Sequence, residues 1–503
     1  MGAMATRVVI VGLDGVSFSL IDPWIVAGEL PKLACIKAQA ACAVMESTIP
    51  PVSLPAWPTF QTGKNPGKHG LFGFYRDGPV KTFFDARHLG AETLWDMLAS
   101  DGRRAVAINV PGTYPPPPLD GALISCMLTP SERDAYTYPA SLKAELLSAI
   151  GEYVIDFDRT KRGMDSLEDL CRVSEKRFEA TQYLWKRVEW DLFCVVFTET
   201  DRAQHRFYHA PEELLRLFRK IDGYLGEILS WLREDDLLII LSDHGFGEVR
   251  KHIFLNSWLR EEGYLATRLT RQDKVRRRTG RRKPSLLERL FRRYGAEIDW
   301  ERTRAYLYSA AARAVNVNLK GREPSGTVEP TEFEAHRAAL VEKLCELRDP
   351  DTREPLFSRV LRREDIYRGE YADSVPDILT VFAAAGYAFK RRPDARRIVQ
   401  RCSRPRAGHT PHGIFMLRGR GIRPLPELPT VHLTDVVPTA LWALGVPIPE
   451  DLDGRVLTEL FEEGAIAAKP PRFRPPRKKL RMAGAVEPTE ELEDRLRQLG
   501  YID

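Results

Sequence analysis

Cysteine is scarce in this sequence, and its few copies are not arranged in pairs. The seven cysteines are scattered over 503 residues, and none of them forms a CxxC motif. An odd and scattered set argues against a disulfide framework and against a zinc site made of cysteines, and it is typical of a reducing compartment. We therefore expect a cytoplasmic protein.

Long apolar runs and a strong net charge are also missing. No run of about 18 apolar residues occurs, so no membrane span is expected. The first apolar run, VVIVGL, is short and stops at Asp14, which is not the pattern of a signal peptide. The net charge is only +5, so we expect no general binding to polyanions and no sequence-specific recognition of nucleic acid.

Short β-branched runs alternate with amphipathic stretches along most of the chain. The expected strands cover residues 7–13, 103–110, 191–198, 236–242 and 376–382. Helix periodicity is clear between them, as in residues 211–232. The strands are apolar almost throughout, which is typical of a mostly parallel central sheet with helices on both faces. The sequence therefore predicts an α/β fold.

We expect one catalytic domain over residues 1–460, with inserted cap segments at about 113–185 and about 265–300, where the strand pattern is absent. Residues 461–503 are expected to form a basic Pro/Arg-rich linker and a C-terminal helix. The basic run 271–293 precedes an amphipathic end, which predicts a peripheral contact with an anionic membrane. A solvated charge run is the commoner explanation of such a pattern. Nothing in the sequence bears on the oligomeric state.

Three of the apolar runs are followed by an aspartate. Asp14 follows the first run, Asp201 follows the third, and Asp243 follows the fourth. Ligands of an open parallel sheet gather outside the carboxyl ends of its strands, so these side chains are expected to meet in one crevice. A buried carboxylate is costly unless it binds a cation. Three of them together therefore predict a metal site.

Two of these aspartates have a histidine close by. His205 lies four residues after Asp201, which places both on one face of a helical turn, and His244 directly follows Asp243. Carboxylate oxygen and imidazole nitrogen are ordinary ligands of zinc, and a set rich in carboxylates also suits manganese. We therefore expect divalent ions, zinc or manganese, in this crevice.

A serine earlier in the chain lies in a proline-rich segment, whose backbone has little conformational freedom. Residues 47–70 read STIPPVSLPAWPTFQTGKNPGKHG, in which Ser53 has prolines on both sides and Pro55 suits the first turn of a helix. A plain helix-capping serine has the same local sequence. Beside a metal ion and a helix N-terminus, the same hydroxyl would be a nucleophile, because both favour its ionised form. The expected metal ligands favour the nucleophile.

Five motifs then follow one another in a recognisable order: VGLDG, VSLPAWPTFQTGKNPGKHG, TDRAQH, SDHGFG and GHTPHGIF. This ordered set resembles the alkaline phosphatase superfamily, and within it the type I phosphodiesterase/nucleotide pyrophosphatase family. The resemblance covers most of residues 5–460. It implies an alkaline-phosphatase-like fold and a phosphohydrolase with two metal ions, usually zinc. The substrate it implies is a phosphodiester or related phosphate ester of a small molecule, and the basic run 271–293 adds a lipid-linked phosphate as a candidate.

The resemblance also implies roles for single residues. Ser53 matches the nucleophile that is transiently phosphorylated. The ligands implied for one ion are Asp14, Ser53, Asp243 and His244. Those implied for the other are Asp201, His205 and a late histidine, for which His409 fits the motif better than His412. His412 then becomes a candidate for substrate binding.

One position departs from the pattern. Nucleotide pyrophosphatases resemble this stretch but carry an asparagine three residues after the nucleophile, where this chain has Ala56. Another donor to the phosphoryl oxygens is therefore needed, and Lys64 is the candidate. Two alternatives stay open: a phosphomonoesterase or phosphomutase of the same superfamily, and a metal-bound anion-binding protein without turnover.

Overall fold

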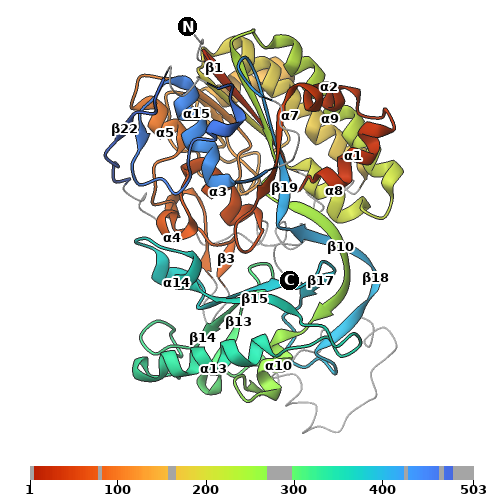
Figure 1. Ribbon diagram of the computed structural model, residues 1–503, viewed down its shortest axis with the longest axis vertical. Coiled ribbons are helices and arrows are strands. Elements are labelled where there is room, and N and C mark those ends of the chain that lie inside the picture. Colours follow the sequence, from red (N-terminus) through yellow and green to blue (C-terminus); the bar gives the residue numbers. More distant parts are fainter. Residues whose placement is uncertain are drawn as a thin grey trace.

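The computed structural model describes residues 5–76, 82–156, 166–268, 297–423, 429–463 and 469–479. A large sheet with helices on both faces forms the upper part of the molecule in Figure 1, and smaller sheets form the lower part. Two long strands, drawn in green and blue, run from one part to the other. The fold is therefore α/β, as the sequence predicts.

The large sheet has nine strands in the order β20-β2-β19-β9-β1-β8-β5-β6-β7. Their bounds are β1 (Arg7–Leu13), β2 (Ala41–Glu46), β5 (Ala105–Ile108), β6 (Gly121–Ile124), β7 (Thr137–Tyr138), β8 (Leu192–Phe197), β9 (Asp236–Leu241), β19 (His412–Arg418) and β20 (Thr430–His432). The run from β9 to β6 is parallel throughout. Only β19, between β2 and β9, and the edge strand β7 run antiparallel to their neighbours. This confirms the mostly parallel sheet.

Both faces of the sheet are buried, which explains why its strands are apolar almost throughout. Along β1, Val9 and Leu13 belong to one core cluster, whereas Val8 and Ile10 belong to the other. The helices that supply the first cluster are α1 (Phe18–Val26), α2 (Pro31–Gln39), α6 (Leu142–Ile150), α7 (Leu167–Arg187) and α9 (Pro211–Trp231). Those that supply the second are α3 (Ser53–Thr62), α5 (Leu94–Ala99) and α15 (Val436–Leu444).

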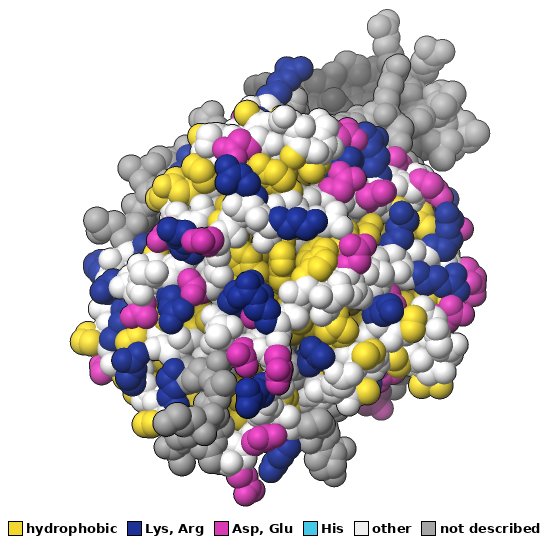
Figure 2. Space-filling view, turned by 90° about the horizontal axis from the view of Figure 1, so that it is seen from above, with side chains coloured by type: hydrophobic (Ala, Val, Ile, Leu, Met, Phe, Trp, Pro, Cys, Tyr) yellow, Lys and Arg dark blue, Asp and Glu magenta, His cyan; other side chains and the backbone are white. Residues whose placement is uncertain are grey.

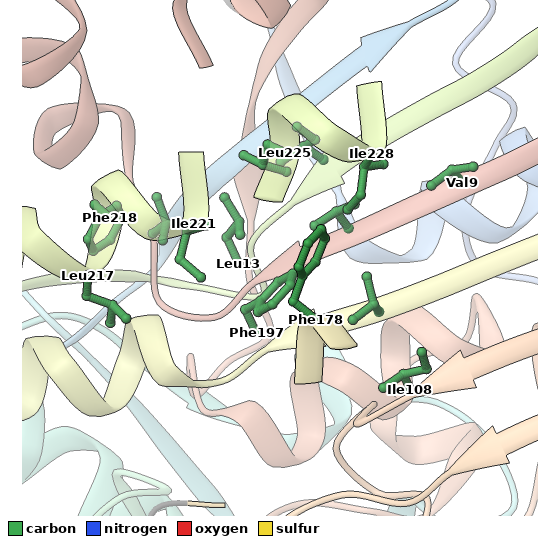
Figure 3. Packing of buried hydrophobic residues seen from close by; sticks show 14 of the residues in the cluster. Val9, Leu13, Ile108, Phe178, Phe197, Leu217, Phe218, Ile221, Leu225 and Ile228 are labelled. Carbon is green, nitrogen blue, oxygen red and sulfur yellow. The ribbon is translucent and has the colours of Figure 1, made fainter. Parts of the chain in front are cut away.

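Figure 3 shows the first cluster from close by. Phe178 of α7 and a row of aliphatic side chains of α9 point toward Leu13 and Phe197 on the sheet. The helix predicted at 211–232 is thus confirmed as α9, and its apolar face is the one that meets the sheet. On the outer face shown in Figure 2, basic and acidic side chains are interspersed.

The lower part is built from two sheets between residues 245 and 410, the first mixed and the second antiparallel. The first contains β10 (Gly245–Ile253), β17 (Tyr387–Phe389) and β18 (Val399–Thr410). The second contains β13 (Ala305–Ser309), β14 (Ala314–Val317), β15 (Phe357–Arg362) and β16 (Ile378–Phe382). The helices beside them are α10 (Leu255–Glu261), α13 (Phe333–Cys345) and α14 (Arg363–Ile366).

One predicted strand lies in a different sheet from the others. We expected residues 376–382 in the parallel sheet, but they form β16, which pairs antiparallel with β14 and β15. Its last two residues are half-buried, unlike the central strands of the large sheet. A short apolar run has the same pattern in either sheet, so periodicity alone could not decide between them.

The segment expected as a cap at about 113–185 takes part in the core instead. It contributes β6 and β7 to the large sheet and α6 and α7 to its cover. The described ends of the segment 265–300 form a short pair, β11 (Thr267–Arg268) with β12 (Glu297–Ile298). The basic run 271–293 lies outside the described residues.

Beyond residue 463, the tail is described only between 469 and 479. There, β22 (Phe473–Arg474) pairs with β21 (Ile448–Pro449). Arg474 lies 3.1 Å from the carboxylate of Glu92, and Lys479 lies 2.6 Å from that of Asp96. This part of the basic linker therefore lies along the core, and the expected C-terminal helix falls outside the described residues. Among the described helices, none has the length and hydrophobicity needed to cross a membrane.

His69 closes the loop that follows α3. The loop contains α4 (Pro66–His69), and a short pair, β3 (Tyr75–Arg76) with β4 (Thr82–Phe83), comes after it. The His69 ring is fully buried, accepts the N–H of Leu71 at Nδ1 and lies 3.0 Å from the Thr59 hydroxyl at Nε2. Burial lowers the pKa of His69 to about 3. The ring is therefore neutral and structural.

This histidine is expected to make the metal-free protein lose stability in mild acid. Its pKa is lower in the folded than in the unfolded chain, so the unfolded chain takes up the proton first as the pH falls below about 6.5. Between about pH 7.5 and about pH 5, His69 should cost about 2 kcal/mol of unfolding free energy. Urea unfolding of the wild type and His69→Asn measures this, and parallel pH profiles of the two proteins would contradict it.

Candidate active site

Three neighbouring strands of the large sheet end at the same edge, and each is followed by an aspartate. The strand β1 lies between β8 and β9 and pairs in parallel with both. Asp14 follows β1, Asp243 follows β9, and Asp201 lies in the first turn of α8 (Glu199–Phe207) after β8. All three are fully buried. The crevice expected from the strand ends is therefore present.

His244 lies at the centre of the first group of side chains. Its Nε2 is 3.3 Å from the Ser53 hydroxyl, 3.5 Å from Asp14 Oδ1 and 3.3 Å from Asp243 Oδ2. These are the four residues that the sequence assigns to one ion. One oxygen of Asp201 also lies close, since ligand atoms of Asp14, Asp201 and His244 all lie within 4.8 Å of one another.

The second group of side chains lies around Oδ1 of Asp201 in the same crevice. His409 Nε2 lies 3.0 Å from His205 Nε2 and 3.3 Å from Asp201 Oδ1. His205 and Asp201 stand four residues apart on α8, and Nε2 of the histidine lies 3.6 Å from Oδ1 of the aspartate. The three ligand atoms lie within 4.8 Å of one another. This is the set expected for the other ion.

The long strands β10 and β18 bring the distant histidine into place. They pair antiparallel, and Phe246, two residues after His244, lies opposite His409. The rings of His244 and His409 stack with their centroids 4.0 Å apart. His412 lies beyond the end of β18, at the exposed start of β19. The structure therefore brings His409, and not His412, to the cluster.

Ser53 is held in an irregular turn at the start of α3. The residue before it, Val52, is extended, and Leu54 has φ −111° and ψ 94°, so regular helix begins only at Pro55. The side chain of Ser53 is fully buried and directed at His244 rather than back at its own helix. The plain capping role that the local sequence allowed is not what this geometry shows.

The electrostatics of the first group show an excess of buried negative charge. Burial, together with the nearby charges of Asp243 and Asp201, raises the pKa of Asp14 well above its usual range. Burial also raises the pKa of Asp243 to about 7. Burial lowers the pKa of His244 well below that of a free histidine. A cation is therefore the missing partner of these carboxylates.

The available atoms in the same group suit a metal ion. Asp14 Oδ1 and Asp243 Oδ2 are buried and accept no hydrogen bond from any residue that the structure describes. His244 Nδ1 lies 3.1 Å from the carbonyl oxygen of Gly245, to which it can donate, so Nε2 keeps its lone pair on the side of the carboxylates. Carboxylate oxygens with imidazole nitrogen fit zinc or manganese.

Asp201 differs from the other two aspartates because it forms an ion pair with a buried arginine. Arg202 Nη1 lies 2.6 Å from Asp201 Oδ2, and Arg202 Nη2 lies 3.1 Å from Asp156 Oδ2, all of them buried. Burial opposes the ionisation of Asp201, but His205, His409 and Arg202 together hold its pKa well below the usual range. The arginine thus fixes one carboxylate oxygen and leaves the other for the histidines.

A tryptophan and a glycine fix Asp14. Trp57 Nε1 donates to Asp14 Oδ2 over 3.2 Å. A Cβ atom on Gly12 would lie 2.4 Å from the Trp57 ring, so only glycine allows this approach. The VGLDG motif therefore carries both a ligand and the space for the residue that orients it.

Lys64, one of the expected substrate contacts, does not lie beside Ser53. Lys64 follows the far end of α3, and its Nζ lies 2.6 Å from Asp451 Oδ2. Its ammonium therefore faces Asp451 rather than Ser53, and the structure does not bring it to the phosphoryl position. Ala56 is buried in the apolar cluster under the sheet, so it offers no polar group either.

A cavity of about 430 Å³ adjoins the cluster at His409. Its walls come from the loop 46–51 before the nucleophile, from β10 and β18, and from the end of β16. This volume suits a small molecule or part of a larger one. His412 and Arg313 also line it.

Sequence reasoning missed the supporting residues of this site. Arg202 stands inside the TDRAQH motif, so its place beside a ligand could have been noticed. Trp57 follows the nucleophile by four residues, which the helical spacing places on the same side. Arg313 belongs to no motif, and nothing in its local sequence points to the cavity.

Comparison with known structures defines the class of the fold. Phosphonoacetate hydrolase from Sinorhizobium meliloti superposes with a TM-score of 0.57 and 18% identity, over 88% of this chain and 96% of that one. Murine ectonucleotide pyrophosphatase/phosphodiesterase 5 superposes with a TM-score of 0.52 and 15% identity, over 91% of this chain and all of that one. The fold is therefore alkaline-phosphatase-like.

Sequence comparison then gives the family. The profile of type I phosphodiesterase / nucleotide pyrophosphatase matches residues 8–413, so the chain belongs to this family of phosphoric ester hydrolases. A stretch of 74 residues is 30% identical to human ectonucleotide pyrophosphatase/phosphodiesterase family member 1. That stretch covers 13% of this chain and only 8% of the human protein.

Proposed function

We propose that this protein is a metal-dependent phosphohydrolase that cleaves a phosphodiester or a related phosphate ester through a phosphoserine at Ser53. The observation that carries the proposal is the buried Ser53 hydroxyl, 3.3 Å from His244 Nε2, which itself lies 3.5 Å from Asp14 and 3.3 Å from Asp243. Membership of the family supports the class of reaction.

The seven clustered residues would hold two divalent ions, zinc or manganese. One ion would be held by Asp14, Ser53, Asp243 and His244, and the other by Asp201, His205 and His409. Such ions, when bound, lower the pKa of a hydroxyl or a water and neutralise the charge of phosphoryl oxygens.

Ser53 would act in two displacements. In the first, its oxygen bonds to phosphorus, its proton passes to solvent, and the departing ester oxygen leaves as an alcohol after taking up a proton. In the second, a water oxygen replaces the serine oxygen on phosphorus, which restores the hydroxyl and releases a phosphate monoester. The rigid turn around Ser53 keeps the attacking oxygen in line, because Pro55 and the irregular Leu54 leave the backbone little freedom.

The relatives suggest the kind of substrate to test. The murine phosphodiesterase 5 has also been solved as an inactive threonine-to-alanine variant with AMP. The Sinorhizobium hydrolase has been solved with phosphonoacetate. We propose a small phosphate ester for this chain, with a lipid-linked phosphate as the second choice because of the basic run at 271–293.

Metal analysis together with two chromogenic substrates tests the proposal. We expect about two zinc or manganese ions per chain and cleavage of bis-p-nitrophenyl phosphate, with slower cleavage of p-nitrophenyl phosphate. Cleavage of the monoester alone would favour a phosphatase or a phosphomutase. Bound metal without turnover of either compound would favour the anion-binding protein, and a chain that binds no metal would contradict the whole proposal.

A further inference from the structure

The cavity beside His409 contains an arginine that forms no ion pair with any acid among the described residues. Arg313 is half-buried, and no carboxylate of the described residues lies within ion-pair distance of its guanidinium. The acids of the same cavity have other partners: Glu248 pairs with Arg250 at 2.8 Å, and Glu46 lies 3.6 Å from His432. A cation in this position lacks the anion that would balance its charge.

The structure holds this guanidinium firmly at the edge of the metal cluster. Its Nη2 donates to the carbonyl oxygen of His409 over 2.7 Å, and its carbon lies 4.7 Å from the centre of the Phe382 ring. Thr380 fixes the backbone, because its hydroxyl and its N–H both donate to the carbonyl oxygen of Arg313, at 2.8 and 3.0 Å. The Nε and Nη1 groups remain as donors.

The turn that carries Arg313 also touches the nucleophile loop. Ala311 packs against the cluster that contains Val52 and Leu54, the two neighbours of Ser53. Arg313 itself has φ +50°, a left-handed conformation that a residue other than glycine adopts at a cost of about 1 kcal/mol. Such strain is retained where a side chain has to point in a particular direction.

We propose that Arg313 binds a second anionic group of the substrate, a carboxylate or another phosphate attached near the phosphoryl group that Ser53 attacks. This deepens the proposed function and rests on it for the identity of the attacked group. The substrate class is then an organic phosphate with two separate anionic groups rather than an ester whose only anionic group is the attacked phosphate.

Two ligands that differ only in one carboxylate test this inference. Carboxyethylphosphonate and propylphosphonate share the phosphonate and have similar length. Calorimetric binding to the zinc-loaded protein is expected to be about tenfold tighter for the first, since a charge-assisted pair contributes about 1.5 kcal/mol. In Arg313→Gln this preference should vanish while propylphosphonate binds as before. Arg313→Lys should keep part of it, because the charge remains and the fork is lost.

Arg359→Gln is the matched control. Arg359 lines the same cavity but is exposed and makes no ion pair with a described residue, so its loss should change the preference by less than about threefold. An unchanged preference in Arg313→Gln would overturn the inference. Equal weakening of both ligands, or loss of bound zinc, would overturn it as well, because Arg313 would then act only through His409. The binding assay needs no turnover. A failure of this inference can therefore be distinguished from a failure of the proposed hydrolysis, which is measured in a separate assay.

Discussion

Ser53→Ala is expected to lose cleavage of bis-p-nitrophenyl phosphate by at least about a thousandfold in kcat, because the variant lacks the hydroxyl that we propose as the nucleophile. The serine is fully buried, so the smaller alanine fits without strain. Steady-state kinetics with zinc or manganese in excess measure the effect. Bound metal should remain, because the other six ligand residues are unchanged.

Ser53→Thr is the matched control for this result. Threonine keeps a hydroxyl on the same carbon, so it should retain activity well above that of the alanine variant. Its extra methyl group must fit a fully buried position beside His244, which is expected to slow the reaction by about tenfold. Equal activity of the alanine variant and the wild type would show that another group attacks phosphorus.

Asp243→Asn is expected to stabilise the metal-free protein and to abolish its stabilisation by metal. The pKa of Asp243 is about 7 in the folded chain, above its value in the unfolded chain, because of burial. The contribution of Asp243 to the unfolding free energy of the metal-free wild type should therefore fall as the pH rises from about 4 to about 7, by at most about 4 kcal/mol, opposite in sign to the contribution of His69. Asparagine carries no charge and removes this loss, but it binds zinc poorly.

Thermal unfolding at about pH 8, with a chelator and with excess zinc, measures both effects. Asp222→Asn is the control, because Asp222 is also a buried carboxylate but accepts the backbone N–H groups of Lys32 and Leu33. That variant should be destabilised in both conditions and should keep the shift caused by zinc. If the metal-free Asp243→Asn protein were less stable than the metal-free wild type, the claim that the first group holds an excess of buried negative charge would be contradicted.

The core of the fold could be predicted from the sequence because its signals are local. The strand β1 is apolar on both faces and ends at Asp14, so its run of hydrophobic residues indicates a covered parallel strand and a ligand at its end. The antiparallel layer could not be predicted in this way. Its strand β16 is as apolar as a core strand, and one of its two partners, β14, is distant in the sequence.

The residues of the candidate site also differ in whether a local sequence signal reveals them. Asp201 with His205, and Asp243 with His244, are recognisable because their spacing is short and their place after a strand is fixed. The choice of His409 came from the resemblance, and the structure agrees with it through the pairing of β10 and β18. Arg313 could not be predicted, because only the tertiary structure brings its turn against the loop that carries Ser53.

Trapping of the phosphorylated protein tests the central claim most directly. The zinc-loaded wild type would be mixed with bis-p-nitrophenyl phosphate, quenched in acid within the first turnovers, digested and analysed by mass spectrometry. The account predicts a phosphoryl ester on the peptide that contains Ser53, and none in Ser53→Ala. Rapid turnover with no modified Ser53 peptide at any quench time, or the same modification on another residue, would contradict it.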